Sequence, residues 1–316
     1  MSTNGGDRGG KAPRWGRPAG ETRKEVSTRS VRGGTQSLLM TRLATHLVVL
    51  VFVAFALYPI LWVLSIALSS AGLATHGGVI PIPHGLTLDN ARTVVGVGRP
   101  GGVALFARQL TSSVVVSLGT AIVGVIVATP AAYALARFRF VGARAAERGL
   151  MATQMFPAVA SAVPLYLILD ALHLLDTRLG LVLVYASTAV PFAIFQLRGS
   201  FETIPIDLEE AAMVDGATRF QAFVRVVLPA ARPAIAVTAL FCFMAAWNEF
   251  ILAATLLSRE SSFTLPIVLQ RYVGEHDAAW GPFAAGAVLV SAPVMVFFYL
   301  VQKQLVAGLT AGGVKG

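Results

Sequence analysis

Long apolar runs recur along this chain and are separated by shorter polar stretches. Each run holds about 20 mainly apolar residues, which is the length that an α-helix needs to cross the roughly 30 Å hydrocarbon core of a bilayer. A helix is stable there because it bonds its own backbone groups. We therefore predict an all-α membrane protein with six transmembrane helices: Leu47 to Leu68, Leu110 to Ala136, Leu150 to Leu169, Leu179 to Leu197, Ala234 to Leu257 and Pro282 to Val301.

The composition supports a membrane location. Apolar residues make up 55% of the 316, charged residues make up 13%, and the mean hydropathy is +0.71. A soluble domain of ordinary composition carries roughly 25% charged residues, because they cover its surface. Among the six predicted spans, only the fifth carries an ionisable Asp, Glu, Lys or Arg, which is Glu249.

The basic residues predict the orientation. If the N-terminus is inside, 19 of the 25 Lys and Arg residues fall on the cytoplasmic side. Cytoplasmic loops carry an excess of Lys and Arg, so we expect both termini in the cytoplasm of a multi-pass protein of the cell membrane. Residues 1–46 hold nine of these basic residues in a Gly/Ser/Thr-rich setting, which is typical of a disordered tail rather than of a nucleic-acid-binding domain. Residues 47–305 then form the six-span transmembrane domain, and residues 306–316 form a cytoplasmic tail.

The cytoplasmic loop at residues 201–232 is far longer than a connection between two spans needs. Asp207 and Glu210 have the spacing of a capping box that opens a short helix, and Gly216 is placed to end it. Thr218 and Gln221 form a second box, and the helix that follows is predicted to be interrupted at Pro229. The sequence therefore predicts a helix-turn-helix elbow with a small, partly apolar surface.

Other interpretations of this elbow remain open at this point. A helix-turn-helix also occurs in DNA-binding proteins, but this one is tethered between membrane spans and its first helix is acidic. The helix can also lie idle on the membrane surface, as in a structural scaffold.

A secondary transporter is an alternative for the whole chain. It would need an ion site and usually internal repeats, and the six spans show neither clearly.

The elbow resembles a known family. Glu210-Ala-Ala212, Gly216, Val226 and Leu228-Pro229 match the EAA motif of membrane subunits of bacterial ABC importers, with valine at the position where isoleucine is commonest. The stretches Ala246-Trp-Asn-Glu-Phe250 and Gly308-Leu-Thr-Ala-Gly-Gly-Val-Lys-Gly316 are similar to the maltose and maltodextrin type of carbohydrate permease. The resemblance covers roughly residues 45 to 316.

The resemblance implies a type I importer permease whose EAA helix docks on a separate ATPase. The residues that it assigns to this coupling are Asp207, Glu209, Glu210, Ala211, Ala212, Met213, Asp215, Gly216, Leu228 and Pro229. The partners that it implies are a second, homologous permease subunit, an ATPase dimer, an extracytoplasmic sugar-binding protein and membrane lipid, with no nucleic acid. The implied solute is a di- or oligosaccharide such as a maltodextrin; the alternatives are trehalose or a solute of the glycerol-phosphate type.

Polar residues inside the spans are candidates for the solute path. Asn248 and Glu249 are the sharpest pair, because an ionisable side chain in a span is costly and normally faces a cavity or a partner. A polar network between helices is the alternative. Gln154 and Tyr166 are further candidates. In the outer loop from Ser258 to Trp280, the candidates for contact with a binding protein are Tyr272, Glu275, His276 and Trp280.

The sequence predicts neither an enzyme nor a cofactor site. It contains no G-x-x-x-x-G-K-[ST] phosphate loop, so ATP must be bound by another chain. A single cysteine, Cys242, excludes a cysteine metal site, and the five histidines do not have metal-ligand spacing.

Overall fold

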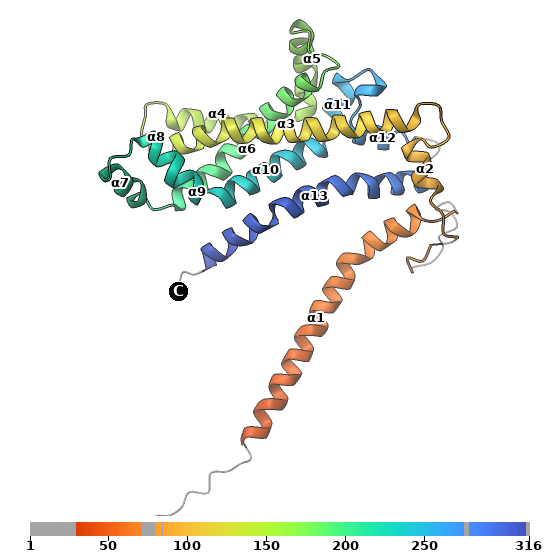
Figure 1. The fold of residues 1–316 in the computed structure, drawn as a ribbon, viewed down its shortest axis with the longest axis horizontal. Helices are drawn as coiled ribbons and strands as arrows, with labels where there is room; N and C mark the ends of the chain where they lie inside the picture. The colour runs from red at the N-terminus through yellow and green to blue at the C-terminus, as the bar shows by residue number, and fades with distance from the viewer. Residues whose placement is uncertain (1–29, 71–79, 84, 275–277, 314–316) are drawn as a thin grey trace, which may run out of the picture. The chain divides into compact units, whose positions relative to one another are not determined.

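The structure is a computed structural model that describes residues 30–70, 80–83, 85–274 and 278–313 (Figure 1). Across these residues it is helical and contains no β-strand, only two isolated antiparallel bridges, Ser69 with Leu86 and Val273 with Ala278. The internal contacts divide the chain into two units, Met1–Leu57 and Tyr58–Gly316. The prediction of an all-α protein is confirmed for the described residues.

The first helix, α1 (Ser30–Ala67), contains all of the predicted first span except Leu68. It begins well before Leu47, so the prediction of a disordered tail over residues 1–46 is wrong for residues 30–46. Leucine and methionine, both good helix formers, occur repeatedly between residues 38 and 43, and within α1 the first proline is Pro59. Residues 1–29 lie outside the described part of the chain.

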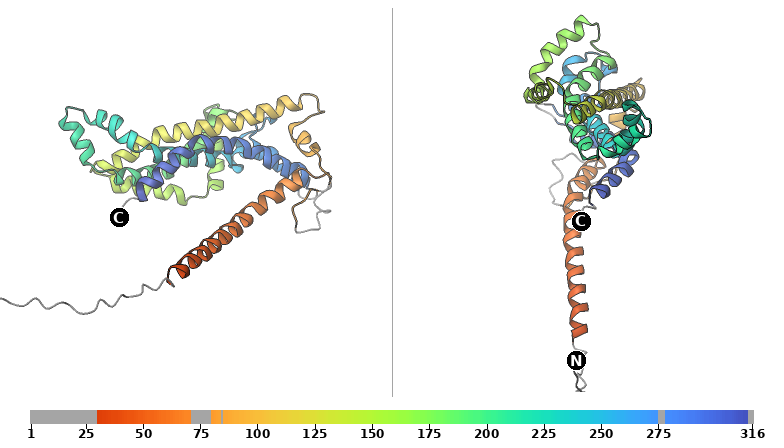
Figure 2. Two further views of the ribbon diagram at one scale, coloured as in Figure 1. Left: turned by 60° about the horizontal axis from the view of Figure 1, so that its bottom comes forward. Right: turned by 90° about the vertical axis from the view of Figure 1, so that its left-hand side faces the viewer.

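The second unit is a bundle of long helices. α3 (Gly102–Arg137) packs against α6 (Arg178–Thr203) and α10 (Arg232–Trp247), and α13 (Trp280–Gly313) packs against α10. Figures 1 and 2 show these helices running side by side along the bundle. The predicted cytoplasmic tail at residues 306–316 is helical as far as Gly313, because α13 continues through it.

Small residues bring the helices of the bundle close together. A Cβ added at Gly119 of α3 would lie 2.9 Å from Val182 Cγ2 of α6, and one added at Gly124 would lie 3.0 Å from the buried Cys242 Sγ of α10. Small residues at such interfaces let backbones approach and increase van der Waals contact, which drives helix association in lipid. These contacts fix α3 at the centre of the bundle.

The predicted third span is broken. α4 (Ala143–Met155) ends before Phe156 and Pro157, a short 3₁₀ helix η2 (Ala158–Ser161) follows, and α5 (Ala162–Ala171) leaves at 96° to α4. A proline fixes its own φ and disfavours a helical conformation in the residue before it, so Phe156 is extended.

The predicted fifth span is also shorter than expected. α10 ends at Trp247, and α11 (Ile251–Leu256) is a separate helix. Before α10, the segment Arg219–Ala230 meets Arg232–Trp247 at 75°. In the described residues, four helices are long and apolar enough to cross a membrane by themselves, and two bent pairs bring the number to six.

The two ends of the second unit differ in structure. At one end lie α7 (Asp207–Val214), α8 (Arg219–Ala222), the π-helix η3 (Phe223–Val227) and α9 (Leu228–Ala230), as Figure 1 shows. At the other end lie α2 (Asp89–Val95), η4 (Glu260–Ser262) and α12 (Leu265–Gln270). The elbow predicted from the sequence and the loops predicted to lie outside are therefore at opposite ends of the bundle.

Candidate functional site

The elbow begins with α7, whose start differs from the prediction. Asp207 is the first helical residue, the N-cap is Ile206, and no side chain caps the helix, so the proposed Asp207 and Glu210 capping box is wrong. The carbonyl of Ile206 accepts the N–H groups of Glu209 at 2.9 Å and Glu210 at 3.1 Å. Because backbone carbonyls satisfy these donors, the side-chain cap is not needed. The acidic first turn still complements the helix dipole.

The end of α7 agrees with the prediction. Gly216 has φ of 92°, its N–H donates to the Met213 carbonyl at 3.0 Å, and the Ala217 N–H donates to the Ala212 carbonyl at 3.0 Å. This pair of bonds is a Schellman motif, which requires a residue with positive φ at the glycine position. The predicted capping box of Thr218 with Gln221 is present at the start of α8.

The chain then passes through a π-helix before it enters the bundle. The predicted interruption at Pro229 is wrong, because helix continues through α9 and the sharp bend follows at Ala231. A proline ring crowds the carbonyl four residues earlier, and a π-turn places that carbonyl differently. The π-helix is therefore the local adjustment that lets Pro229 remain in a helix.

A buried ion pair fixes the elbow to the end of α3. Glu209 is 4% exposed. Its Oε1 accepts a hydrogen bond from Arg137 Nε at 2.5 Å, and its Oε2 accepts one from the Tyr133 hydroxyl at 2.7 Å. Arg137 also donates from Nη2 to the carbonyl of Ile204 at 2.8 Å, just before α7. We call Arg137, Tyr133 and Glu209 the latch, because together they join α3 to both sides of the turn between α6 and α7.

Aromatic rings surround the latch. The Tyr133 ring lies 4.3 Å from that of Phe223, 6.0 Å from that of Phe201 and 5.8 Å from that of Phe138, measured between centroids. Phe201 is fully buried, and the guanidinium of Arg219 in α8 lies 5.6 Å from the centroid of the Phe138 ring. These contacts bury the latch and hold α7, α8 and η3 against the ends of α3 and α6, so the elbow is built as a rigid element.

The opposite face of the elbow is open. Ile206, Val214 and Phe220 are 50%, 87% and 74% exposed. The predicted coupling residues divide into three groups. Asp207, Glu210, Ala211, Asp215 and Gly216 are exposed; Ala212, Met213, Leu228 and Pro229 are partly buried; and Glu209 points inward to the latch. A groove of about 320 Å³ beside them is lined by Ala212, Asp215, Gly216, Ala217, Gln221, Ala222, Arg225 and Val226.

Glu249 is held inside a polar network between helices. Its carboxylate accepts hydrogen bonds from the backbone N–H groups of Leu252 at 2.9 Å and Ala253 at 3.1 Å, so it caps α11. The hydroxyl of Tyr185 on α6 donates to the same carboxylate at 2.7 Å. Asn248 is exposed and is the C-cap of α10. Glu249 therefore lies in a polar network between helices, which is the alternative interpretation to a place on the solute path.

Gln154 lies in a different environment. It lines a pocket of about 350 Å³ between the broken third span and α6, together with Thr153, Phe156, Ser161, Leu165, Ser187, Thr188 and Pro191. Gln154 Nε2 donates to the carbonyl of Thr188 at 3.2 Å. Tyr166, 40% exposed on α5, does not line this pocket. The four predicted solute-path residues are therefore not gathered in one site.

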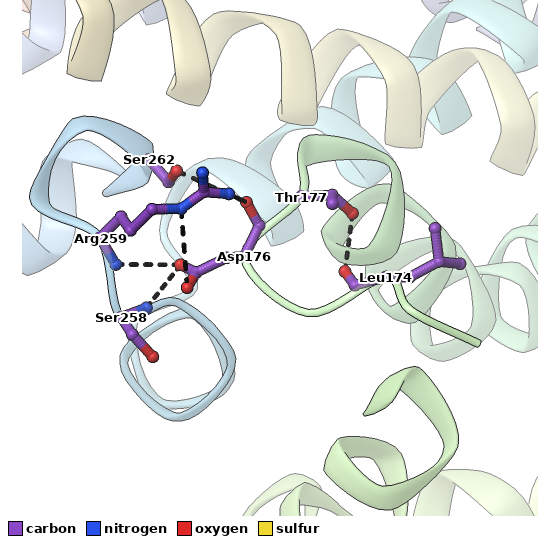
Figure 3. A network of polar contacts seen from close by, with 6 residues as sticks. All are labelled: Leu174, Asp176, Thr177, Ser258, Arg259 and Ser262. Carbon is purple, nitrogen blue, oxygen red and sulfur yellow. Dashed lines mark hydrogen bonds and ion pairs between the residues drawn. The ribbon is translucent and has the colours of Figure 1, made fainter. Parts of the chain in front are cut away.

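At the other end of the bundle, Asp176 joins two loops (Figure 3). Its Oδ1 accepts hydrogen bonds from the backbone N–H groups of Ser258 at 2.6 Å and Arg259 at 3.0 Å, and its carbonyl accepts one from Arg259 Nη2 at 3.0 Å. The φ of Asp176 is 58°, a value that Asp tolerates better than most residues. These bonds fix the start of the loop from Ser258 to Trp280.

Two of the four binding-protein candidates lie in the described residues. Tyr272 is partly buried, and its carbonyl accepts the N–H of Ala279 at 2.8 Å. Trp280 is 41% exposed at the first residue of α13. Glu275 and His276 lie outside the described residues. No group of three or more His, Cys, Asp or Glu side chains that could hold a metal ion occurs among the residues that the structure describes.

The sequence interpretation missed Arg137 and Tyr133. Arg137 follows the predicted second span by one residue, and it entered the argument only as a count of basic residues on the cytoplasmic side. The sequence does carry a signal for them. Arg137 is a charged residue directly after a span, and Tyr133 lies one helical turn before it, so both can face the same partner at this helix end.

A comparison with protein families now adds to this geometry. Residues 121–310 match the model of the family described as "Binding-protein-dependent transport system inner membrane component". The chain belongs to this family. The match includes the latch, the elbow, the pocket beside Gln154 and most of α13. The resemblance of the chain to the membrane subunits of binding-protein-dependent importers is therefore confirmed.

Relatives of known name cover almost the whole permease. The "Trehalose transport system permease protein SugB" of Mycobacterium tuberculosis is 38% identical over 279 residues, which are 87% of this chain and 99% of the relative. The "Maltose/maltodextrin transport system permease protein MalG" of Escherichia coli is 39% identical over 288 residues, which are 86% of this chain and 95% of the relative.

Solved structures show the same fold. A chain of a bacterial ABC transporter involved in the import of the acidic polysaccharide alginate has a TM-score of 0.67 and 27% identity, covering 84% of this permease and 97% of that chain. A second chain, from an alginate ABC transporter in complex with a pentasaccharide-bound periplasmic protein, has a TM-score of 0.59 and 17% identity and supports the fold alone. The predicted type I importer permease fold is confirmed.

Proposed function

We propose that this chain is the membrane-spanning permease subunit of an ATP-driven importer of di- or oligosaccharides. The observation that carries the proposal is the elbow: its inner face is fixed to α3 by the buried latch, and its outer face is exposed. A partner that pushes on the outer face moves α7 together with α3 and α6, because the ion pair and the aromatic rings leave no flexible joint between them. Such rigid-body motion converts closure of an ATPase into rearrangement of the spans.

The partner at the elbow is an ATPase dimer. The exposed surface of α7 and its C-cap combines acidic side chains, Asp207, Glu210 and Asp215, with exposed apolar ones, Leu208 and Val214. A short helix of this kind fits a hydrophobic groove with a basic rim. ATP is hydrolysed by this partner, and the permease itself performs no chemistry.

Two other partners complete the transporter. A second, homologous permease covers apolar surface of this chain, and lipid covers the rest; α13 has several exposed apolar residues, among them Met295, Val296 and Tyr299. A sugar-binding protein docks on the outer side, where Asp176 holds the loop from Ser258 to Trp280. Both termini then lie in the cytoplasm, as the excess of Arg and Lys predicts.

The proposed cargo is a carbohydrate because the named relatives transport carbohydrates. SugB and MalG are named for trehalose and for maltose or maltodextrin, so these are the sugars to test first. Transport proceeds by a shift between inward-open and outward-open states, which ATP binding biases through its differential affinity for the two states.

The proposal is tested by reversing one charge on the exposed face of α7. Glu210→Lys is expected to abolish ATP-dependent uptake of labelled maltose and trehalose and to prevent cross-linking of an Ala211→Cys variant to the ATPase. The matched control is Glu202→Lys on α6, because Glu202 is also exposed and its partner Arg198 keeps a second carboxylate, Glu147 at 2.6 Å.

Both variants are first shown to reach the membrane at wild-type amounts. Normal uptake by Glu210→Lys would refute the coupling role. Uptake that persists with ATP depleted, and that collapses when ion gradients are dissipated with ATP intact, would instead identify a secondary transporter.

A further inference from the structure

The break in the third span leaves non-helical backbone at membrane depth. Residues 156–161 are extended or 3₁₀ between α4 and α5. In the hydrocarbon region such backbone is tolerated only where protein buries it or where it lines a water-filled cavity. Within this chain it is not buried, because Phe156 and Val159 are 60% and 57% exposed. The break therefore faces a water-filled space or a partner subunit.

The pocket beside the break lies near the middle of two candidate membrane spans. Ser187, Thr188 and Pro191 lie near the middle of α6, which is one of the four helices that can cross a membrane alone. The break itself lies in the middle of the bent pair of α4 and α5. Polar groups at this depth are costly and mark pathways or partners, and several of them gather in this pocket.

The polar groups in this pocket suit an uncharged, hydroxyl-rich ligand. Gln154 donates from Nε2 to the Thr188 carbonyl, and the side chain is exposed and carries an acceptor oxygen, Oε1. The hydroxyls of Ser187 and Thr188 donate to carbonyls of their own helix at 2.7 Å and 2.9 Å, which leaves their oxygens free to accept. The exposed ring of Phe156 adds an apolar face.

None of the described residues that line the pocket is Asp, Glu, Lys, Arg or His, so these residues offer nothing to balance a charge. Its volume of about 350 Å³ falls in the range of roughly 300 to 1,000 Å³ that is usual for small-molecule sites.

We propose that this pocket is a subsite through which the permease itself contacts a neutral sugar on its way across the membrane. Gln154, Ser187 and Thr188 hydrogen-bond the sugar hydroxyls, and Phe156 packs against a sugar ring. The proposal rests on the proposed function and narrows it, because it excludes solutes of the glycerol-phosphate type from this subsite.

The single cysteine makes a direct test possible. Cys242 is 2% exposed, so a cysteine introduced at an exposed position is the one that a hydrophilic thiol reagent reaches. Ser187→Cys is made in the assembled transporter in membrane vesicles, and its labelling rate is measured with maltose, trehalose or glycerol 3-phosphate present. Ser291→Cys on α13 is the matched control, because Ser291 is also an exposed serine of a span and lies outside the pocket.

The expected result is that maltose or trehalose slows labelling of Ser187→Cys severalfold, while glycerol 3-phosphate does not and labelling of Ser291→Cys does not change. Adding Gln154→Leu should raise the sugar concentration for half-protection about fivefold to tenfold, the effect of one lost hydrogen bond. Phe156→Ala should weaken protection, and Phe156→Tyr, which keeps the ring, should restore it.

Three outcomes would overturn the subsite. The first is labelling that no sugar slows although the same vesicles import it, the second is absence of labelling in a transporter that works, and the third is protection by glycerol 3-phosphate alone. The first two leave the proposed function intact. A transporter that imports neither sugar would refute the proposed function instead.

Discussion

Glu209→Ala removes the acceptor of two buried hydrogen bonds and leaves the guanidinium of Arg137 buried without its counter-ion. The side chains of Arg137 and Glu209 are only 7% and 6% exposed, so water does not replace the lost partner. Removing one member of a buried ion pair costs about 3–5 kcal/mol. Because folded proteins are stable by only about 5–15 kcal/mol, this loss should be large enough to loosen the elbow.

A double variant separates the charge from the packing. Arg137→Met with Glu209→Leu replaces both ions by apolar side chains of similar volume, and such replacements are often neutral or stabilising. We therefore expect each single variant, Glu209→Leu or Arg137→Met, to be destabilised by about 3–5 kcal/mol and the double variant to regain most of the loss.

The free energy of unfolding is measured for all four proteins by titration with SDS in mixed micelles, followed by tryptophan fluorescence. Uptake is measured in parallel, since a double variant that folds also shows whether the ion pair has a role beyond stability. A single variant that loses less than about 1 kcal/mol, as an exposed pair would, or a double variant whose loss is the sum of the two, would refute the latch.

Three further predictions concern other parts of the molecule. Gly216→Ala should cost about 1–2 kcal/mol in local stability, seen as faster hydrogen exchange across α7, because a residue with a side chain is strained at a φ of 92°. The added Cβ meets nothing within 4 Å, so no steric clash contributes to this cost. Unchanged exchange would contradict the strained turn. Asp176→Ala should speed amide exchange at Ser258 by on the order of tenfold, whereas Asp176→Asn, which keeps an acceptor, should be milder. Tyr185→Phe should destabilise the bundle by about 1–3 kcal/mol in the SDS titration, because it removes the donor to the Glu249 carboxylate; a variant as stable as the parent would count against that network.

The sequence was sufficient for the features that depend on local chemistry. The presence of membrane spans follows from the length of the apolar runs. The capping box of Thr218 with Gln221 is confirmed, and it was predictable because both partners lie within one turn. The Asp207 cap is wrong because carbonyls of the preceding turn satisfied the same donors, and a sequence pattern does not distinguish the two solutions.

Features that depend on direction or on distant contacts could not be predicted. Hydropathy measures composition, so a run such as Leu150 to Leu169 looks the same whether it is straight or bent by 96° at Pro157. The inward orientation of Glu209 depends on Arg137, which lies 72 residues earlier in the chain. For the same reason, Gln154 became a pocket residue only when α4 was placed beside α6.

The latch also has a consequence for how the sequence of this permease evolves. Losing either ion alone is costly, whereas exchanging both for apolar residues is close to neutral, so substitutions at positions 137 and 209 must be accepted in pairs or in rapid succession. Among related sequences these two positions should therefore vary together, although they are far apart in the chain, and a lineage that keeps one charge should keep the other.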